Sequence, residues 1–304
     1  MVIIMEIKPI PEIIKEIDIL TKEEKYDEAY EYAKENVSLN KEYNEGEYVF
    51  KNLLEELLFQ VSFKREVKLK IPQILDYSSL YSNYGKILLH FNELDSALKS
   101  FNLSNSYNPV NVNALFGLAS ISKAKGDWEE YHKLTVQTFK FDYYREDLAK
   151  SFRNLSLYYL NQLSKNPNQD EDNLKIAVAL KRMAEEYDAE SKLAIDELDE
   201  LNKLISNFNT ANSNSNFNSD DLVNQCNDLS IDEIKAYLKS KGLPNSPSVE
   251  VITICKNLGF QLDESKKVVP ALFYFNIAYD LTHDSAIKDV IDDLNQKVER
   301  RLGE

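Results

Sequence analysis

Residues 78–111 decide the expected fold of this chain, and they read SSLYSNYGKILLHFNELDSALKSFNLSNSYNPVN. Apolar side chains recur at helical spacing on both sides of the polar loop 91–95, which predicts two amphipathic helices joined by a turn. Asn108-Pro109 ends the second helix, because proline cannot continue the helical hydrogen bonding. The stretch is therefore expected to form a helical hairpin.

Small residues mark the place where the two helices are expected to cross closely. Gly85 lies inside the first helix, where glycine costs about 1 kcal/mol relative to alanine, so we expect it to serve packing. Ala97 follows twelve residues later on the second helix. Phe101 is expected to fill the gap beside this alanine.

The order of these residues resembles a known helical repeat. Gly85, Ala97, Phe101, Ser104 and Pro109 follow one another as in a tetratricopeptide repeat, whose period is about 34 residues. The resemblance implies an all-α fold, namely a right-handed solenoid of helical hairpins with irregular repeats. It also implies a surface that binds another protein.

The same spacing returns near the C-terminus. Gly259 is followed twelve residues later by Ala271. Phe275 and Ala278 lie four and seven residues beyond that alanine, as Phe101 and its serine do in the first segment. Two occurrences of one pattern favour a repeat protein over a single chance hairpin.

The composition fits a soluble, helical chain. Among 304 residues there are only 7 glycines and 8 prolines, so few positions break a helix. No apolar run approaches the roughly 18 residues of a membrane span, and we identify no signal peptide. The two cysteines give no disulfide framework, which favours a cytoplasmic protein.

The sequence also predicts how the chain is divided. We expect a repeat-like helical array over residues 1–206, with one long helix at 44–63 and a hairpin at 146–188. The Asn/Ser-rich stretch 207–221 is predicted to be a flexible linker, because it lacks the apolar side chains that a packed core needs. Residues 222–304 are expected to add a helical segment with one more hairpin and a capping helix.

No group of residues indicates an enzyme. The three histidines, at positions 90, 132 and 283, are far apart in sequence and do not form a metal-ligand pair of known spacing. A glycine-rich phosphate loop and a nucleophile elbow are both missing from the sequence. We therefore expect a non-catalytic scaffold for protein–protein interaction, without cofactor or metal.

The resemblance also places a candidate binding groove. In tetratricopeptide repeats the first helix of each hairpin lines the concave face, so we project the exposed side of these helices as a peptide-binding groove. The projected residues are Ser82, Lys86, Leu89, Asn113, Phe116, Ser120, Lys123, Lys150 and Arg153. The chain has a net charge of -15, yet residues 71–169 carry a net charge of +1. An acidic peptide segment of another protein is the expected partner.

A nucleic-acid-associated role is the alternative. Residues 229–252 are similar to a SAP motif, a short helix-turn-helix that often binds DNA in its family. The chain has Pro247, Ser248 and Val249 where that family tends to place glycine and basic residues, although phosphate contacts need lysine or arginine. A short basic cluster at 64–70 could add such contacts. The net charge of -15 makes nucleic acid the less expected partner.

Overall fold

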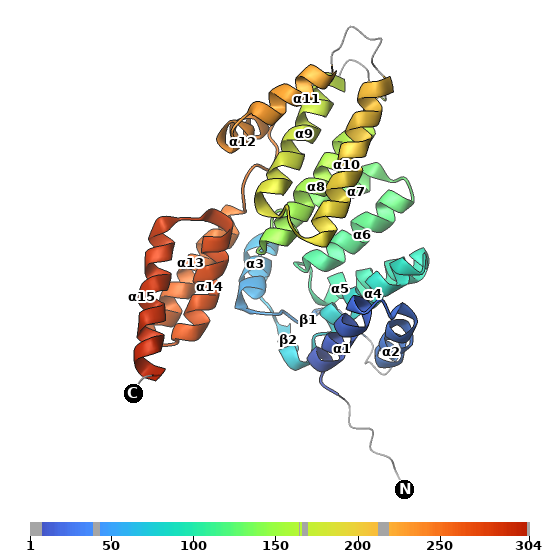
Figure 1. Ribbon diagram of the computed structural model, residues 1–304. Helices are drawn as coiled ribbons and strands as arrows, with labels where there is room; N and C mark the ends of the chain where they lie inside the picture. The colour runs from blue at the N-terminus through green and yellow to red at the C-terminus, as the bar shows by residue number, and fades with distance from the viewer. Residues whose placement is uncertain (1–7, 39–42, 164, 166–169, 212–218, 303–304) are drawn as a thin grey trace. The chain divides into compact units, whose positions relative to one another are not determined.

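The computed structural model is helical along almost its whole length (Figure 1). It describes residues 8–38, 43–163, 165, 170–211 and 219–302, and in these ranges it contains fifteen α-helices and one two-stranded sheet. The all-α prediction is confirmed at this level. The chain divides into two compact units, residues 1–134 and 135–304, with the boundary inside one helix.

The first unit contains three pairs of helices. They are α1 (Ile10–Lys22) with α2 (Tyr26–Ser38), α4 (Tyr77–His90) with α5 (Leu94–Tyr107), and α6 (Val112–Ala124) with α7 (Trp128–Thr138), which crosses the unit boundary. The first helices contact one another in order, α1 with α4 and α4 with α6. Each second helix packs on the next first helix, α2 on α4 and α5 on α6.

Apolar contacts explain this order. Three isoleucines on one side of α1 and two alanines of α2 form a buried cluster with α4. This cluster consists of Ile10, Ile13, Ile17, Ala29, Ala33, Leu80 and Ile87. Burial of this apolar surface stabilises the first hairpin against the second, because each isoleucine or leucine contributes about 1.5–3 kcal/mol when fully buried.

A phenylalanine ring fills a close helix crossing in this unit. Phe101 of α5 is fully buried, and its ring lies against glycines on two neighbouring helices. A Cβ atom at Gly85 of α4 would lie 2.8 Å from the ring, and one at Gly117 of α6 would lie 2.2 Å from it. Gly85 therefore serves close packing, as expected, but its partner is the ring of Phe101, and α6 uses a second glycine for the same ring.

Residues 43–76 lie between the first and second hairpins, and we call them the insert. They form β1 (Glu47–Tyr48), α3 (Leu53–Phe63), β2 (Leu69–Lys70) and the 3-10 turn η1 (Gln73–Leu75). The predicted helix at 44–63 is wrong in its first part. Asn52 caps α3 by accepting a hydrogen bond from the backbone N–H of Glu55, and β1 instead pairs in parallel with β2.

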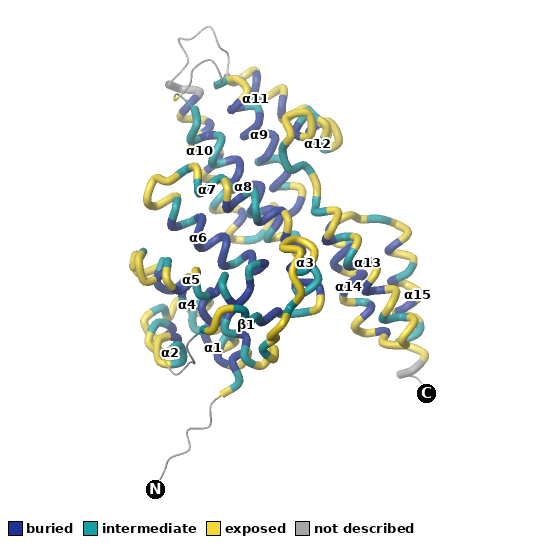
Figure 2. The backbone as a smooth tube through the Cα atoms, turned by 180° about the vertical axis from the view of Figure 1, so that it is seen from behind, coloured by how far each residue is buried: buried dark blue, intermediate teal, exposed yellow. Residues whose placement is uncertain are grey.

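The second unit begins with another antiparallel hairpin and continues with shorter helices. Its elements are α8 (Arg145–Gln162), α9 (Asp170–Tyr187), α10 (Lys192–Ala211), α11 (Ser219–Asp228), α12 (Ile231–Ser240), α13 (Val249–Glu264), α14 (Val268–Thr282) and α15 (Ser285–Leu302). The helices α10, α11 and α12 pack on the α8–α9 hairpin. Buried residues follow α9 along most of its length (Figure 2).

The second predicted occurrence of the repeat pattern packs like the first. Gly259 of α13 faces the ring of Phe275 on α14, where a Cβ atom would lie 2.7 Å from the ring. Ala271 and Ala278 are fully buried on the same helix as the phenylalanine. The shared spacing of glycine and phenylalanine thus gives the same close crossing in both units.

The predicted linker is partly helical. Helix α10 continues to Ala211 and α11 starts at Ser219, so both ends of the stretch 207–221 belong to helices. Residues 212–218 lie outside the described residues. The predicted division at this stretch stays a prediction, while the compact units meet at residues 134 and 135. Among the described helices, none is both long and apolar enough to cross a membrane.

Candidate functional site

A polar cavity of about 370 Å³ opens on the side of the first unit where α1, α4 and α6 meet, which we call the α1–α4–α6 face. Helix α4 lines it with four polar side chains, those of Ser79, Ser82, Asn83 and Lys86. These positions follow one side of a helix, because residues three, four and seven apart share a face. The helix is therefore apolar toward the core and polar toward the cavity.

The other walls come from three further segments. Ile14 and Asp18 belong to α1, and Asn113 belongs to the first turn of α6. Lys51 and Gln73 belong to the insert. Asn113 has a defined position because the helix start is capped, with the backbone N–H of Asn113 donating to the side chain of the preceding cap residue at 3.1 Å. The cavity thus combines amide, hydroxyl, ammonium and carboxylate groups.

Hydrogen bonds fix the α4 wall. The hydroxyl of Ser82 and the side-chain amide of Asn83 both donate to the backbone carbonyl of Ser79, each at 3.0 Å. Asp76, the N-cap of α4, accepts from the backbone N–H of Ser79 at 2.9 Å. The hydroxyl of Ser79 itself is buried and has no hydrogen-bond partner among the described residues. Buried polar groups normally have a partner, so this hydroxyl calls for one.

Three of the projected groove residues meet in this cavity. Ser82, Lys86 and Asn113 all line it, as expected for first helices that share one face. Ser82 is only 2% exposed, however, so its expected exposure is wrong. Its burial follows from the packing of α1 on α4, which a projection along single helices could not include.

The remaining projected residues of the first unit lie outside the cavity lining. Leu89 and Ser120 are half-buried, and Lys123 is exposed in the last turn of α6. The hydroxyl of Ser120 donates to the carbonyl of Phe116 at 2.9 Å. Phe116 was expected on the groove surface but is buried, because α6 is buried on nearly every side and has no open apolar stripe.

The last two projected residues belong to the second unit. Lys150 is half-buried on α8. Arg153 was expected to be an exposed cation, and this is wrong, since its side chain is 3% exposed. Helix α10 packs on α8 and supplies Glu197, whose carboxylate accepts from the Arg153 Nε at 2.5 Å. Asp188 lies 4.0 Å from the same guanidinium group. Arg153 is therefore part of an internal ion pair.

Sequence reasoning missed eight of the eleven residues that line the cavity, including Ser79, Asn83, Lys51 and Gln73. Ser79 and Asn83 could have been found from the polar stripe that they form with Lys86 along one side of α4. Lys51 and Gln73 could not, because no local pattern indicates that an irregular insert folds back onto the helices.

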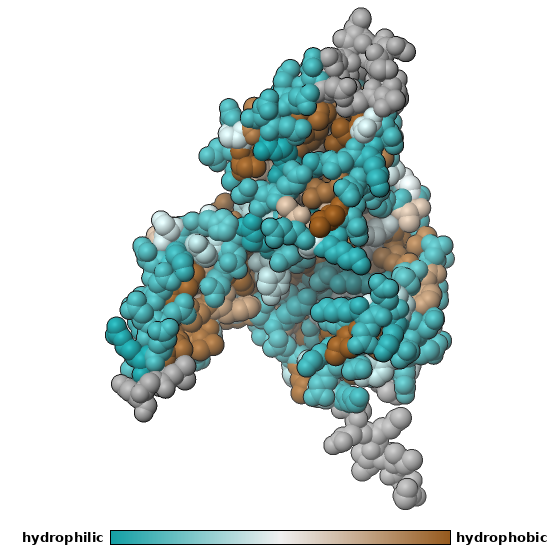
Figure 3. All heavy atoms as spheres, in the orientation of Figure 1, coloured by the Kyte–Doolittle hydropathy of each residue, from teal (hydrophilic) through white to brown (hydrophobic). Residues whose placement is uncertain are grey.

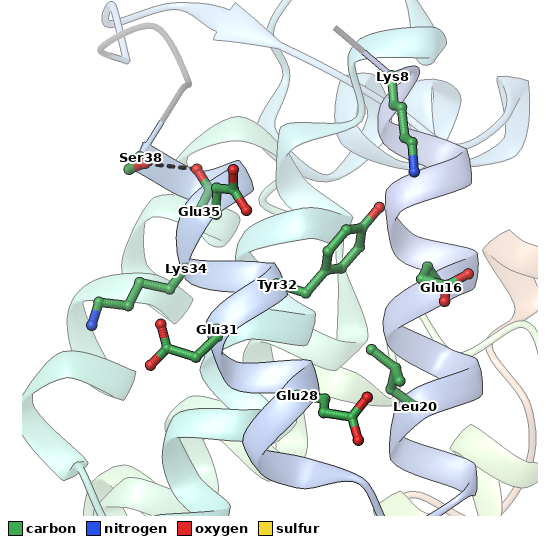
Figure 4. Close-up of a pocket in the computed structure, with 9 residues that line it drawn as sticks. All are labelled: Lys8, Glu16, Leu20, Glu28, Glu31, Tyr32, Lys34, Glu35 and Ser38. Carbon is green, nitrogen blue, oxygen red and sulfur yellow. Dashed lines mark hydrogen bonds between the residues drawn. The ribbon is translucent and has the colours of Figure 1, made fainter. Parts of the chain in front are cut away.

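A larger cleft of about 880 Å³ lies between α1 and α2 (Figure 4). Its lining is dominated by exposed glutamates, such as Glu28 and Glu31. Tyr32 points between the two helices, and the ammonium of Lys8 lies 5.8 Å from its ring centre. The glutamates lie on solvated helix faces, so we regard the smaller, better defined cavity as the candidate site.

A buried carboxyl group lies in the second unit. Asp142 is fully buried and accepts a hydrogen bond from the hydroxyl of Ser151 at 2.6 Å. Burial raises the pKa of Asp142 well above its ordinary value, because desolvation disfavours the charged form. Thr138 also contacts the Ser151 hydroxyl. This group has no access to solvent, so it acts on stability rather than on a ligand.

The described residues contain no group of three or more histidine, cysteine or acidic side chains placed to hold a metal ion. Both cysteines are free and buried, and burial raises the pKa of the Cys255 thiol to about 12. A thiol with such a pKa stays protonated at neutral pH and is a poor nucleophile.

Of the segments behind the nucleic-acid alternative, residues 229–252 are mostly helical, and residues 64–70 form a connection that leads into β2. Residues 229–252 contain α12, whose start is capped by Ser230 together with Glu233, and the beginning of α13. Lys241 at the turn is paired with Asp172 at 2.8 Å. Lys70 of the basic cluster is paired with Glu56. The nucleic-acid role stays a prediction.

Exposed apolar residues are found on the C-terminal helices. Val249 and Phe260 of α13, and Val269 and Phe273 of α14, are each at least 41% exposed. Figure 3 shows apolar surface on this part of the chain, whereas hydrophilic residues dominate much of the first unit's visible face.

A scan against models of protein families finds no match for the chain. A search of curated proteins finds no match either.

Proposed function

We propose that this protein is a non-catalytic scaffold that binds an extended peptide segment of a partner protein on the α1–α4–α6 face. The observation that carries the proposal is the polar cavity, which gathers Ser82, Lys86 and Asn113 from two neighbouring first helices. The order of helix contacts supports it, since α1, α4 and α6 follow one another as the first helices of a repeat array would. The proposal keeps the cytoplasmic location expected from the cysteine content.

The chemistry of the lining suits a peptide. Amide and hydroxyl side chains, such as those of Asn83 and Asn113, can donate to and accept from a peptide backbone. Ile14 and Pro11 of α1 add apolar surface beside them. Lys86 is exposed at the rim, where a positive charge favours the approach of an acidic segment.

The test is a fluorescence polarisation titration of the full chain with two labelled pools of decapeptides, both with amidated C-termini. In the acidic pool every position is Asp, Glu, Ala or Leu, and in the amide pool Asn and Gln replace the acids. We expect tighter binding of the acidic pool. Lys86→Gln should slow its association and weaken the salt dependence, because a rim charge acts mainly on encounter.

Asn113→Ala should weaken binding of both pools, since the amide would contact backbone groups that the pools share. Lys99→Gln is the matched control, because Lys99 is exposed on α5 and does not line the cavity. If the folded protein binds neither pool, or if Lys86→Gln and Asn113→Ala bind both pools like the control, the proposed function is wrong.

A further inference from the structure

The insert is anchored to the second hairpin by specific contacts. Glu55 is 1% exposed, and its carboxylate accepts from the side-chain amide of Asn108 at 2.7 Å and from the backbone N–H of Lys51 at 2.8 Å. The backbone N–H of Val49 donates to the carbonyl of Tyr107 at 3.0 Å. These bonds hold the segment that precedes α3 against the end of α5.

Two parts of the insert that are distant in sequence meet at the cavity. Gln73 of η1 donates from its side-chain amide to the backbone carbonyl of Lys51, and both residues line the cavity. Lys51 is therefore fixed on two sides, by Glu55 through its N–H and by Gln73 through its carbonyl. A residue held in this way presents its side chain from a defined backbone position.

The groups that remain unpaired define what the cavity can accept. Lys51 is half-buried, and its ammonium forms no ion pair with the described residues. The hydroxyl of Ser79 is buried without a partner. The carboxylate of Asp76 is already engaged as the cap of α4. The exposed carboxylate of Asp18 on the α1 wall repels negative charge, so the cavity favours one acidic group of a ligand over two. An ammonium and a hydroxyl together suit one carboxylate, which accepts hydrogen bonds from both.

We propose that the insert is the specificity element of the α1–α4–α6 face, and that Lys51 and Ser79 bind one acidic side chain of the bound peptide. Gln73 is a positioning residue, since it acts through the backbone of Lys51. This inference rests on the proposed function, because it assigns the part of the peptide that the cavity recognises. The repeat-like helices then supply the surface that binds the peptide, and the insert selects peptides that carry an acidic side chain.

The experiment uses the acidic and amide pools described above and measures the ratio of their dissociation constants. Lys51→Gln should reduce the preference for the acidic pool by about fivefold, the effect of an ion pair worth about 1 kcal/mol. Gln73→Leu should lower the same preference less, and Lys99→Gln should leave it unchanged. A change in the ratio separates selection of a carboxylate from a general loss of affinity.

Ser79→Ala provides an independent readout. It should reduce the preference for the acidic pool, while the thermal unfolding midpoint of the free protein stays equal or rises, because removing a buried unpaired hydroxyl relieves its desolvation cost. A merely structural serine would instead lower the midpoint and leave the preference intact.

The outcomes separate this inference from the proposed function. If binding depends on Lys86 and Asn113 while Lys51→Gln and Ser79→Ala keep the full preference, the face binds peptides and the role of the insert is wrong. A third pool, with amide side chains and free C-termini, tests the source of the carboxylate. If only this pool depends on Lys51, the cavity binds a chain end and the side-chain assignment is overturned.

Discussion

A methyl group at Gly117 would lie 2.2 Å from the ring of Phe101, which is closer than two non-bonded carbon atoms approach each other in folded proteins. The ring cannot move away toward α4, because it is already packed against Gly85 there. A methyl group at Gly85 would itself lie only 2.8 Å from the ring. Phe101 is also fully buried, so no solvent-filled space is open to it. Gly117→Ala must therefore separate α5 and α6 or force the ring off its rotamer.

The magnitude follows from two opposing effects. Overpacking a core costs roughly 1–3 kcal/mol, and the short contact places this substitution at the upper end. Alanine is favoured over glycine inside a helix by about 1 kcal/mol, which offsets part of that cost. We expect a net loss of about 2 kcal/mol in the free energy of unfolding of the first unit. Gly85→Ala, with its longer contact, should cost less.

Urea unfolding followed by tryptophan fluorescence measures this effect. Trp128 is the only tryptophan of the chain, and it begins the helix that follows α6. Ser96→Ala on the exposed side of α5 controls for helix propensity alone. In the double variant with Phe101→Leu, the smaller side chain should make Gly117→Ala less costly by about 1 kcal/mol or more. An unfolding midpoint for Gly117→Ala equal to or above that of the unchanged chain would refute the close crossing.

Three further predictions concern buried groups. Asp142→Asn should stabilise the chain increasingly as pH rises above about 4, because the raised pKa of Asp142 makes its ionisation oppose folding. Urea midpoints of the variant and the unchanged chain across the pH range check this, and a difference between them that stays constant with pH would contradict it. Phe116→Ala should lower the free energy of unfolding by about 3–5 kcal/mol, because it leaves a cavity in the core where the ring is buried. Urea unfolding measures this loss, and an unchanged midpoint would contradict it. Arg153→Ala should lower the free energy of unfolding by roughly 2–3 kcal/mol, which is less than for a fully buried pair because Glu197 retains contact with water. In the same urea assay, Glu197→Gln should cost less than the loss of the arginine.

The helical class and two close helix crossings could be predicted because their signals are local. Glycine and phenylalanine sixteen residues apart identify a hairpin from a single stretch, as Gly85 with Phe101 and Gly259 with Phe275 show. The start of α3 could not be predicted in the same way. The strand β1 pairs with residues 69–70, more than twenty positions away, and such a partner leaves no period in the segment itself.

The candidate site was only partly predictable for a related reason. The register of first helices placed Lys86 and Asn113 on one face, and both line the cavity. Arg153 and Phe116 were misplaced, because the burial of a helix depends on what packs on it from elsewhere in the chain. Helix α10 covers Arg153, and its sequence gives no sign of which earlier helix it will contact.

The wide sequence span of the cavity has a consequence for synthesis. Glu55 and Asn108, which anchor the insert, are 53 residues apart, and the lining extends from Pro11 to Asn113. The α1–α2 hairpin therefore leaves the ribosome well before the helices that complete its face, by an interval on the order of ten seconds at ordinary rates of translation. During that time the isoleucines of α1 lack their partners on α4 and present an apolar stripe to the cell. An apolar stripe left uncovered for that time favours aggregation until α4 has been made.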